Sequence, residues 1–203
     1  RIPAVLASTG GPEADDALID ALRAERFEVR YRCAVALVRR RKLGLPVSRR
    51  AWRPLVWKAI AAEVHRDRPI WELQRLLDGQ EADDELVVQR VDTRGLTSLE
   101  HTFRMLTLVL DPEPVRAAFH GVILDEERLR TYALEYLDHA LPAKIREKLW
   151  TFIGDISERQ RARDMRPLDH VVSDLVSTRA TLFAGEKERD ALKRMLADEN
   201  RKG

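Results

Sequence analysis

The sequence repeats itself at an offset of one hundred residues, and this repeat restricts the fold more than any other feature. Residues 12–37 align with residues 112–137 without a gap. Each copy begins with Pro in the first turn of a predicted helix, passes through a short polar turn and continues into a second helix. Helix pairs that bury only one face must stack on neighbours to close a core, as in an α-solenoid. The matched pairs are Pro12 and Pro112, Glu13 and Glu113, Ala17 and Ala117, Leu22 and Val122, Val29 and Leu129, Arg30 and Arg130, Cys33 and Ala133, and Leu37 and Leu137.

The second helix of each copy carries apolar residues at i, i+4 and i+8, which lie on one face of a helix. The stripes are Val29, Cys33 and Leu37 in the first copy, and Leu129, Ala133 and Leu137 in the second. We therefore expect Cys33, Leu37, Ala133 and Leu137 to be buried.

Arg30 and Arg130 occupy the same position of the repeat. The guanidinium group is planar and permanently charged, so it pairs well with carboxylates. We predict that both residues tie one repeat to the next, through carboxylates or helix-end carbonyls, and do not bind a ligand.

The rest of the chain is also predicted to be helical. Residues 1–8 resemble the second helix of a preceding copy, and a third partial copy begins at Pro142. Residues 48–110 are predicted to be a long helical insertion, made of two helices joined by an acidic loop. Pro69 should start a new segment or kink its helix, because it lacks an N–H and crowds the preceding turn. These elements fill a predicted domain of residues 1–155, and a polar helical tail, residues 156–203, follows it.

Composition excludes several classes of protein. The 36 Lys and Arg residues nearly balance the 34 Asp and Glu residues, so the net charge of +2 argues against a general nucleic-acid binder. The single cysteine, Cys33, allows no internal disulfide and indicates a reducing compartment. No apolar run approaches the roughly 20 residues of a membrane span. The chain begins at Arg1, so we expect it to be a domain of a longer protein.

Two segments resemble known HEAT-repeat sequences. The first copy, GGPEADDALIDALRAERFEVRYRCAVAL, is similar to HEAT repeats of the bacterial PBS-lyase type. The run from His101 resembles the soluble HEAT-repeat region of bacterial ADP/ATP-translocase-like proteins of the major facilitator superfamily. The matching residues there are Phe103-Arg104-Met105-Leu106, Arg128-Leu129-Arg130 and Ala133-Leu134-Glu135-Tyr136-Leu137-Asp138. The resemblance covers residues 1–153 and implies an all-α, HEAT-like α-solenoid that acts as a cytoplasmic accessory or regulatory domain. It carries over no catalytic or nucleotide-binding residue.

The motifs of common catalytic and metal sites are missing from the sequence. It contains no G-x-x-x-x-G-K-[ST], G-x-G-x-x-G, H-E-x-x-H or C-x-x-C. Asp138-His139 and Asp169-His170 are neighbours that point about 100° apart on a helix, so neither pair easily holds one ion. Asp125, Glu126 and Glu127 are predicted to be a helix N-cap and first-turn carboxylates. We therefore predict no enzyme activity, no cofactor and no metal.

The strongest candidate binding site is a basic run that no acidic residue interrupts. It consists of Arg39, Arg40, Arg41, Lys42, Arg49, Arg50 and Arg53, and Trp52 and Trp57 lie beside it. We expect these cations to share one surface, because Gly44 and Pro46 break the helix and bring both halves of the run to one turn. Anionic lipid, nucleic acid or an acidic protein would be bound there. The alternative is a solvated helix end, whose negative terminus favours cations.

Three functions remain open on these grounds. The first is a non-catalytic interaction and regulatory module, the cytoplasmic domain of a nucleotide-translocase-like membrane transporter. Its partners would be another protein or its own membrane domain, with anionic lipid as a further candidate. The second is a nucleic-acid-binding relative of HEAT-like DNA glycosylases, against which the low net charge argues. The third is a chaperone or lyase for a bilin chromophore, which only the generic repeat type suggests.

Overall fold

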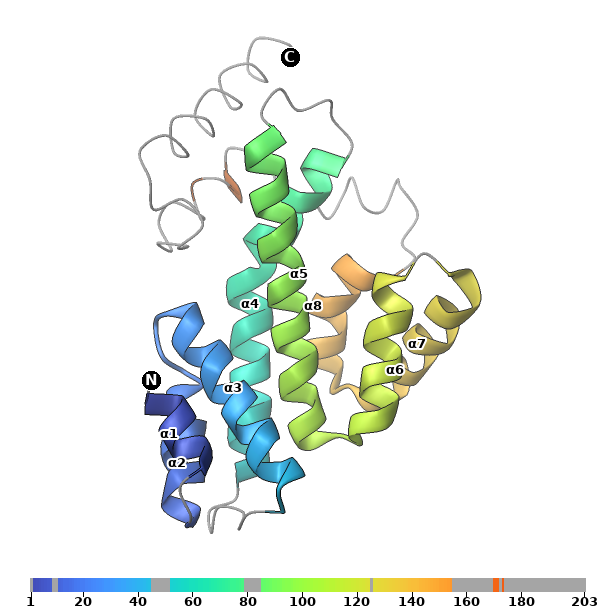
Figure 1. The fold of residues 1–203 in the computed structure, drawn as a ribbon. Coiled ribbons are helices and arrows are strands. Elements are labelled where there is room, and N and C mark those ends of the chain that lie inside the picture. The colour runs from blue at the N-terminus through green and yellow to red at the C-terminus, as the bar shows by residue number, and fades with distance from the viewer. Residues whose placement is uncertain are drawn as a thin grey trace. The chain divides into compact units, whose positions relative to one another are not determined.

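The computed structural model describes residues 2–8, 11–44, 52–78, 85–124, 126–154, 170, 171 and 173. Eight α-helices and no strand occur among these residues, which confirms the prediction of an all-α chain (Figure 1). Within the same residues, no helix has both the length and the apolar character needed to cross a membrane. The predicted polar helical tail, residues 156–203, lies outside the described residues, apart from residues 170, 171 and 173.

The chain divides into two compact units. The first unit comprises Arg1–His65 and Leu99–Gly154, and the second comprises Arg66–Ser98 and Asp155–Gly203. Both repeat copies belong to the first unit, so the candidate site is built there.

The first repeat copy is a helix pair with an additional helix packed against it. Helices α2 (Pro12–Ala21) and α3 (Phe27–Lys42) form the pair, and α1 (Ile2–Ser8) contacts both. Pro12 lies at the first positions of α2, where the missing N–H costs nothing because the group has no intrahelical partner. Leu18, Leu22 and Cys33 are buried in the core of this pair.

The second copy begins its helices at the same offset. Helices α6 (Pro112–Ile123) and α7 (Glu127–Ala140) start one hundred residues after α2 and α3, and α8 (Ala143–Ile153) follows. Asp111 caps α6 by accepting a hydrogen bond from the Glu113 N–H. Gly121 allows α6 and α7 to pack closely, because a Cβ there would lie 2.5 Å from the Leu129 carbonyl oxygen. The sequence match thus extends to the starts of the helices.

The predicted core positions are confirmed. Cys33, Leu37, Ala133 and Leu137 are all buried. Leu129, which continues the same stripe of the second copy, is 41% exposed instead. It lies in the first turn of α7, where the neighbouring α6 is already ending, so less surface is available to cover it.

Two long helices occupy the region predicted as an insertion. They are α4 (Trp52–Asp78) and α5 (Glu85–Val109), which run antiparallel, because Arg53 reaches Val109 while Glu63 lies beside His101. Pro69 was predicted to start a new segment or to kink its helix. It lies inside α4, so no new segment starts there, and the kink stays a prediction. The next residues, Ile70 and Trp71, are buried, and their packing outweighs the cost of about 3 kcal/mol for proline inside a helix.

Candidate interaction surface

The basic run does not form one surface, because Arg40 is buried. The Arg40 Nε donates to the Asp15 carboxylate, and its two terminal nitrogens donate to the carbonyls of Leu6 at 3.0 Å and Gly11 at 2.9 Å. Arg40 therefore fastens α3 to α1 and α2. The prediction that Arg40 shares a surface with the other cations of the run is wrong for a geometric reason. Consecutive helical residues are about 100° apart, so a run of four faces every direction around the helix.

Two further cations of the run are bound to the end of α5. Arg41 Nη1 donates to the carbonyls of Thr107 at 2.8 Å and Leu108 at 2.5 Å. Arg53 Nη2 donates to the Val109 carbonyl at 2.5 Å. The last carbonyls of a helix have no intrahelical donor and carry partial negative charge. Arg41 and Arg53 thus supply hydrogen bonds and positive charge where α5 needs both.

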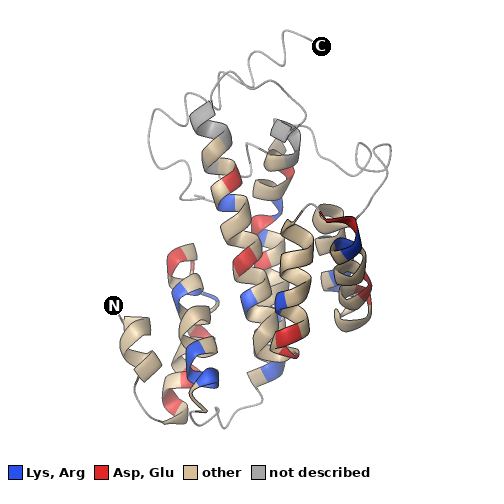
Figure 2. Cartoon of the chain, turned by 45° about the vertical axis from the view of Figure 1, so that its right-hand side comes forward, with Lys and Arg blue, Asp and Glu red and all other residues tan. Residues whose placement is uncertain are grey.

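Arg39, Arg41 and Lys42 are exposed on α3, and among them only Arg41 is bonded to the described residues of α5. Arg49 and Arg50 lie outside the described residues. Arg32 is exposed on the same side of α3, and Val35 between them is 39% exposed. Figure 2 shows basic residues along this helix. We call Arg32, Val35, Arg39 and Lys42 the α3 cationic face. The sequence interpretation missed Arg32 because it lies outside the uninterrupted run, although the spacing 32, 35, 39 and 42 follows the helical period.

Arg30 and Arg130 make corresponding contacts. Arg30 Nη1 donates to the carbonyls of Ala24 and Glu25 after α2, and Arg130 Nη1 donates to the Val122 carbonyl near the end of α6. Each side chain also reaches a helix outside its own pair. Arg30 binds both carboxylate oxygens of Glu63 on α4, at 2.6 and 2.8 Å, and Arg130 donates to the Ile153 carbonyl at the end of α8.

Glu63 also neighbours a buried histidine. His101 Nε2 lies 3.8 Å from Glu63 Oε1, and the His101 ring packs edge-on against Phe27 and at a tilt against Tyr31. Both Glu63 and His101 are fully buried. The sequence interpretation did not single out Glu63. The available signal was its position between Ile60 and Val64 on the apolar stripe of α4, where a carboxylate requires a buried cation.

The second unit contains a similar buried carboxylate. Asp67 accepts hydrogen bonds from the Ser98 hydroxyl and from Arg94 Nη2, the latter at 3.2 Å. One turn later, the Trp71 indole N–H donates to the Gly95 carbonyl at 3.3 Å. These contacts join the two long helices within this unit.

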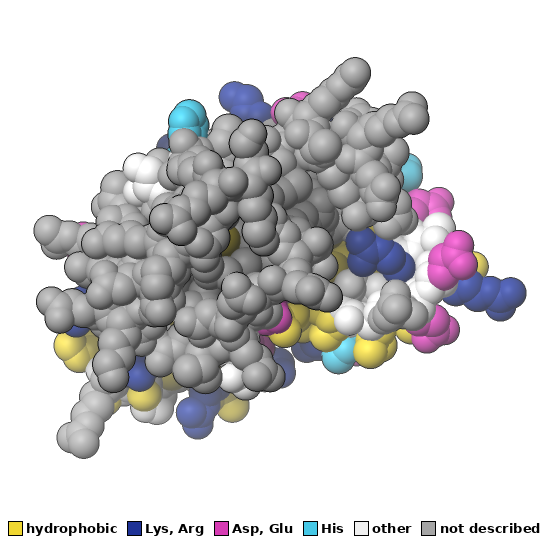
Figure 3. All heavy atoms as spheres, turned by 90° about the horizontal axis from the view of Figure 1, so that it is seen from above, with side chains coloured by type: hydrophobic (Ala, Val, Ile, Leu, Met, Phe, Trp, Pro, Cys, Tyr) yellow, Lys and Arg dark blue, Asp and Glu magenta, His cyan; other side chains and the backbone are white. Residues whose placement is uncertain are grey.

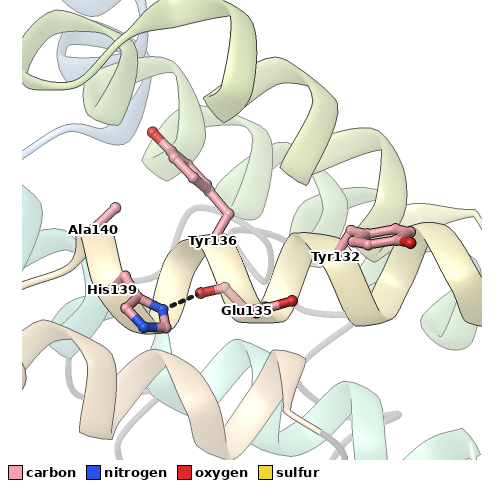
Figure 4. A pocket seen from close by; sticks show the side chains of 5 residues that line it. All are labelled: Tyr132, Glu135, Tyr136, His139 and Ala140. Atoms are coloured by element: carbon pink, nitrogen blue, oxygen red, sulfur yellow. Dashed lines mark hydrogen bonds between the residues drawn. The ribbon is translucent and has the colours of Figure 1, made fainter.

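A shallow recess of about 380 Å³ lies along one side of α7 (Figure 4). It is lined by Tyr132, Glu135, Tyr136, His139 and Ala140. Burial and the nearby Asp111 carboxylate raise the pKa of the Tyr136 phenol. Tyr136 and Ala140 correspond to Ala36 and Arg40 of the first copy, which are buried. In the first copy, α1 packs against α3 and helps to cover this face. The recess lies on the corresponding face of α7 in the second copy.

Charge is mixed over the described side chains that are seen from above in Figure 3. Basic, acidic and hydrophobic groups lie among one another there. The described side chains in this view thus carry charges of both signs.

The predicted metal and capping residues are placed as follows. Among the described residues, no group of three His, Cys, Asp or Glu side chains is arranged to hold a metal ion. Asp125 lies outside the described residues, and Glu126 takes the N-cap position of α7 without a side-chain hydrogen bond. Burial raises the pKa of the Cys33 thiol, which disfavours the nucleophilic thiolate.

Comparisons of the chain with protein-family models, curated proteins and solved structures found no match. The resemblance to HEAT repeats therefore rests on the sequence segments quoted above. Function is inferred below from the contacts of the described residues together with that resemblance.

Proposed function

We propose that this chain is a non-catalytic interaction module of HEAT-like helix pairs, and that it is the cytoplasmic domain of a bacterial nucleotide-translocase-like membrane protein. One observation carries the module part of the proposal. Arg30 and Arg130, one hundred residues apart, each join the turn of a helix pair to a helix outside that pair. Equivalent residues with equivalent contacts are what stacked repeats require.

The buried charges support a structural role for this part of the molecule. Arg30 with Glu63 and Arg40 with Asp15 hold separate helices together. A buried ion pair adds little net stability, but it selects one arrangement of helices, because any shifted arrangement leaves a buried charge without its partner. A scaffold with one fixed arrangement suits recognition of a partner by a preformed surface.

Two surfaces of the first unit are available for that recognition. They are the α3 cationic face and the tyrosine-lined recess of α7. Tyrosine and arginine are enriched in the centres of protein interfaces. The partner in this proposal is another protein or the membrane part of the same protein.

Fractionation of the native organism tests the membrane part of the proposal. An antibody against this chain should detect a protein larger than 23.4 kDa in the membrane fraction, and alkaline carbonate should not release it. A native product of 23.4 kDa in the soluble fraction would contradict that assignment while leaving the interaction module intact.

A nucleic-acid-binding relative of HEAT-like DNA glycosylases is the second candidate. The exposed cations of α3 favour it, while the net charge of +2 argues against it. Phosphate binding releases counterions, so duplex DNA titrated at two salt concentrations should show a steep loss of affinity if this candidate is correct. Absence of binding at the lower salt concentration would exclude it.

A further inference from the structure

We infer that the α3 cationic face binds an acidic helical segment of a partner protein. This inference rests on the proposed role as an interaction module and names the chemistry of the partner. Arg32, Arg39 and Lys42 are exposed, and none forms an ion pair or hydrogen bond with a described residue. Arg40, Arg41 and Arg53 are already bonded to Asp15 and to carbonyl groups. Arg32, Arg39 and Lys42 are thus the exposed cations of α3 that the described residues of α1, α2 and α5 do not bind.

The spacing of these cations fits a second helix. Arg32 and Arg39 are seven residues apart, which is two turns, or about 10 Å along the helix axis. Lys42 follows one turn later, so the three charges form a row along α3. Carboxylates at the same intervals on a partner helix would face all three cations at once.

Val35 favours a protein partner over nucleic acid or anionic lipid. It lies in the middle of the row and is 39% exposed. A leucine on a partner helix would cover it and remove apolar surface from water, which phosphate groups would not do. DNA carries a charge about every 1.7 Å of its axis and favours a broad field of cations, while this face offers a single row. An inserted membrane anchor would need larger apolar side chains than one half-exposed valine.

Glu28 limits where the acidic residues of the partner can lie. It is exposed one turn before Arg32, on the same side of α3. A carboxylate of the partner opposite Glu28 would be repelled, so the acidic positions should start opposite Arg32. The end of the partner that lies over the first turn of α3 should be neutral or basic.

A designed peptide tests this inference directly. The probe is a fluorescent helical peptide of roughly 18 residues, with glutamates at positions i, i+7 and i+10 and leucine at i+3. Its control has the same composition in scrambled order. Fluorescence anisotropy at low ionic strength should show binding of the first peptide and at least about tenfold weaker binding of the second.

Matched variants locate the site. The triple variant Arg32→Gln, Arg39→Gln, Lys42→Gln should bind the peptide about tenfold more weakly, because three surface ion pairs are lost together. The control variant Arg128→Gln, Lys144→Gln, Lys148→Gln removes the same charge from exposed positions on α7 and α8 and should change the affinity less than about threefold. Circular dichroism should show both variants folded. Val35→Ser should weaken binding without changing its salt dependence.

Several outcomes would overturn the inference. Equal binding of the ordered and scrambled peptides, or equal loss in both triple variants, would mean unspecific attraction between charges. Tighter binding of single-stranded DNA, or of phosphatidylglycerol vesicles over phosphatidylcholine vesicles, through the same three cations would assign the face to another class of ligand. None of these results bears on the membrane fractionation, so failure of this inference and failure of the proposed membrane assignment remain distinguishable.

Discussion

At the scale of single residues, adjacent arginines in this chain have opposite roles. Arg39 is exposed to solvent, whereas Arg40 is buried with Asp15 between three helices. The side chains are chemically identical, so their surroundings alone decide the difference. Composition and local sequence therefore cannot separate a cation that binds a partner from one that holds the fold.

The Arg40–Asp15 pair allows a test of that difference. Arg40→Met should lower the free energy of unfolding by about 3–5 kcal/mol, because Asp15 would remain buried without a cation. The adjacent change Arg39→Met should alter it by less than about 0.5 kcal/mol. Urea denaturation of both variants measures this. Similar values for both would show that Arg40 is not buried as described.

Leu137 and Leu129 form a second matched pair, because both lie on the same predicted stripe of α7. Leu137 is fully buried, and Leu137→Ala should cost about 2–5 kcal/mol of stability. Leu129 is 41% exposed, and Leu129→Ala should cost less than about 1 kcal/mol. Chemical denaturation of both variants measures the two losses of stability. A loss below about 0.5 kcal/mol for Leu137→Ala would remove this residue from the core.

Cys33 should be a slow nucleophile in the folded protein. It is buried, and burial raises the pKa of its thiol, so little thiolate forms near neutral pH. We expect a disulfide reagent such as DTNB to label Cys33 much faster in denaturant than in buffer. The thiolate of Cys33 in the folded protein should therefore form only at a pH above the pKa of an ordinary cysteine thiol. Rapid labelling of the native protein would contradict its burial.

At the scale of elements, helix starts were predictable, whereas contacts between helices far apart in sequence were not. Pro12 and Pro112 mark the starts of α2 and α6 because proline favours the first turn of a helix. The sequence left two outcomes open at Pro69, a new segment or a kinked helix, because local sequence gives the cost of proline but not the packing that opposes it. The structure has α4 continue through Pro69. No local pattern in α3 identifies the α5 carbonyls as partners of Arg41.

The end of α5 should depend on Arg41. Arg41→Gln should speed hydrogen exchange in the last turn of α5 and lower stability by about 1 kcal/mol, because two carbonyls lose a charged donor. Arg39→Gln, two residues earlier on the same helix, should leave the exchange of that turn unchanged. Mass spectrometry of the peptide that spans residues 104–110 measures both variants. Equal exchange in both would exclude a capping role.

At the scale of the whole molecule, we expect stability that does not depend on a metal. The full sequence contains no C-x-x-C or H-E-x-x-H motif, so no common zinc arrangement is encoded. Protein purified without added metal should contain far less than one zinc or iron per chain by mass spectrometry. A chelator should not change its unfolding midpoint. Stoichiometric zinc, or loss of structure on chelation, would show that the histidines had been misinterpreted.

The sequence by itself determined the helical class, the repeat and four of the core positions. Helical periodicity and proline placement are local properties, so Cys33, Leu37, Ala133 and Leu137 could be assigned to the core from spacing alone. Only the tertiary structure decided which cations are used inside the fold. That decision depends on which helix end or carboxylate comes within about 3 Å of each guanidinium group, and pairs such as Arg30 with Glu63 are far apart in sequence. The α3 cationic face is what remains after those contacts are made.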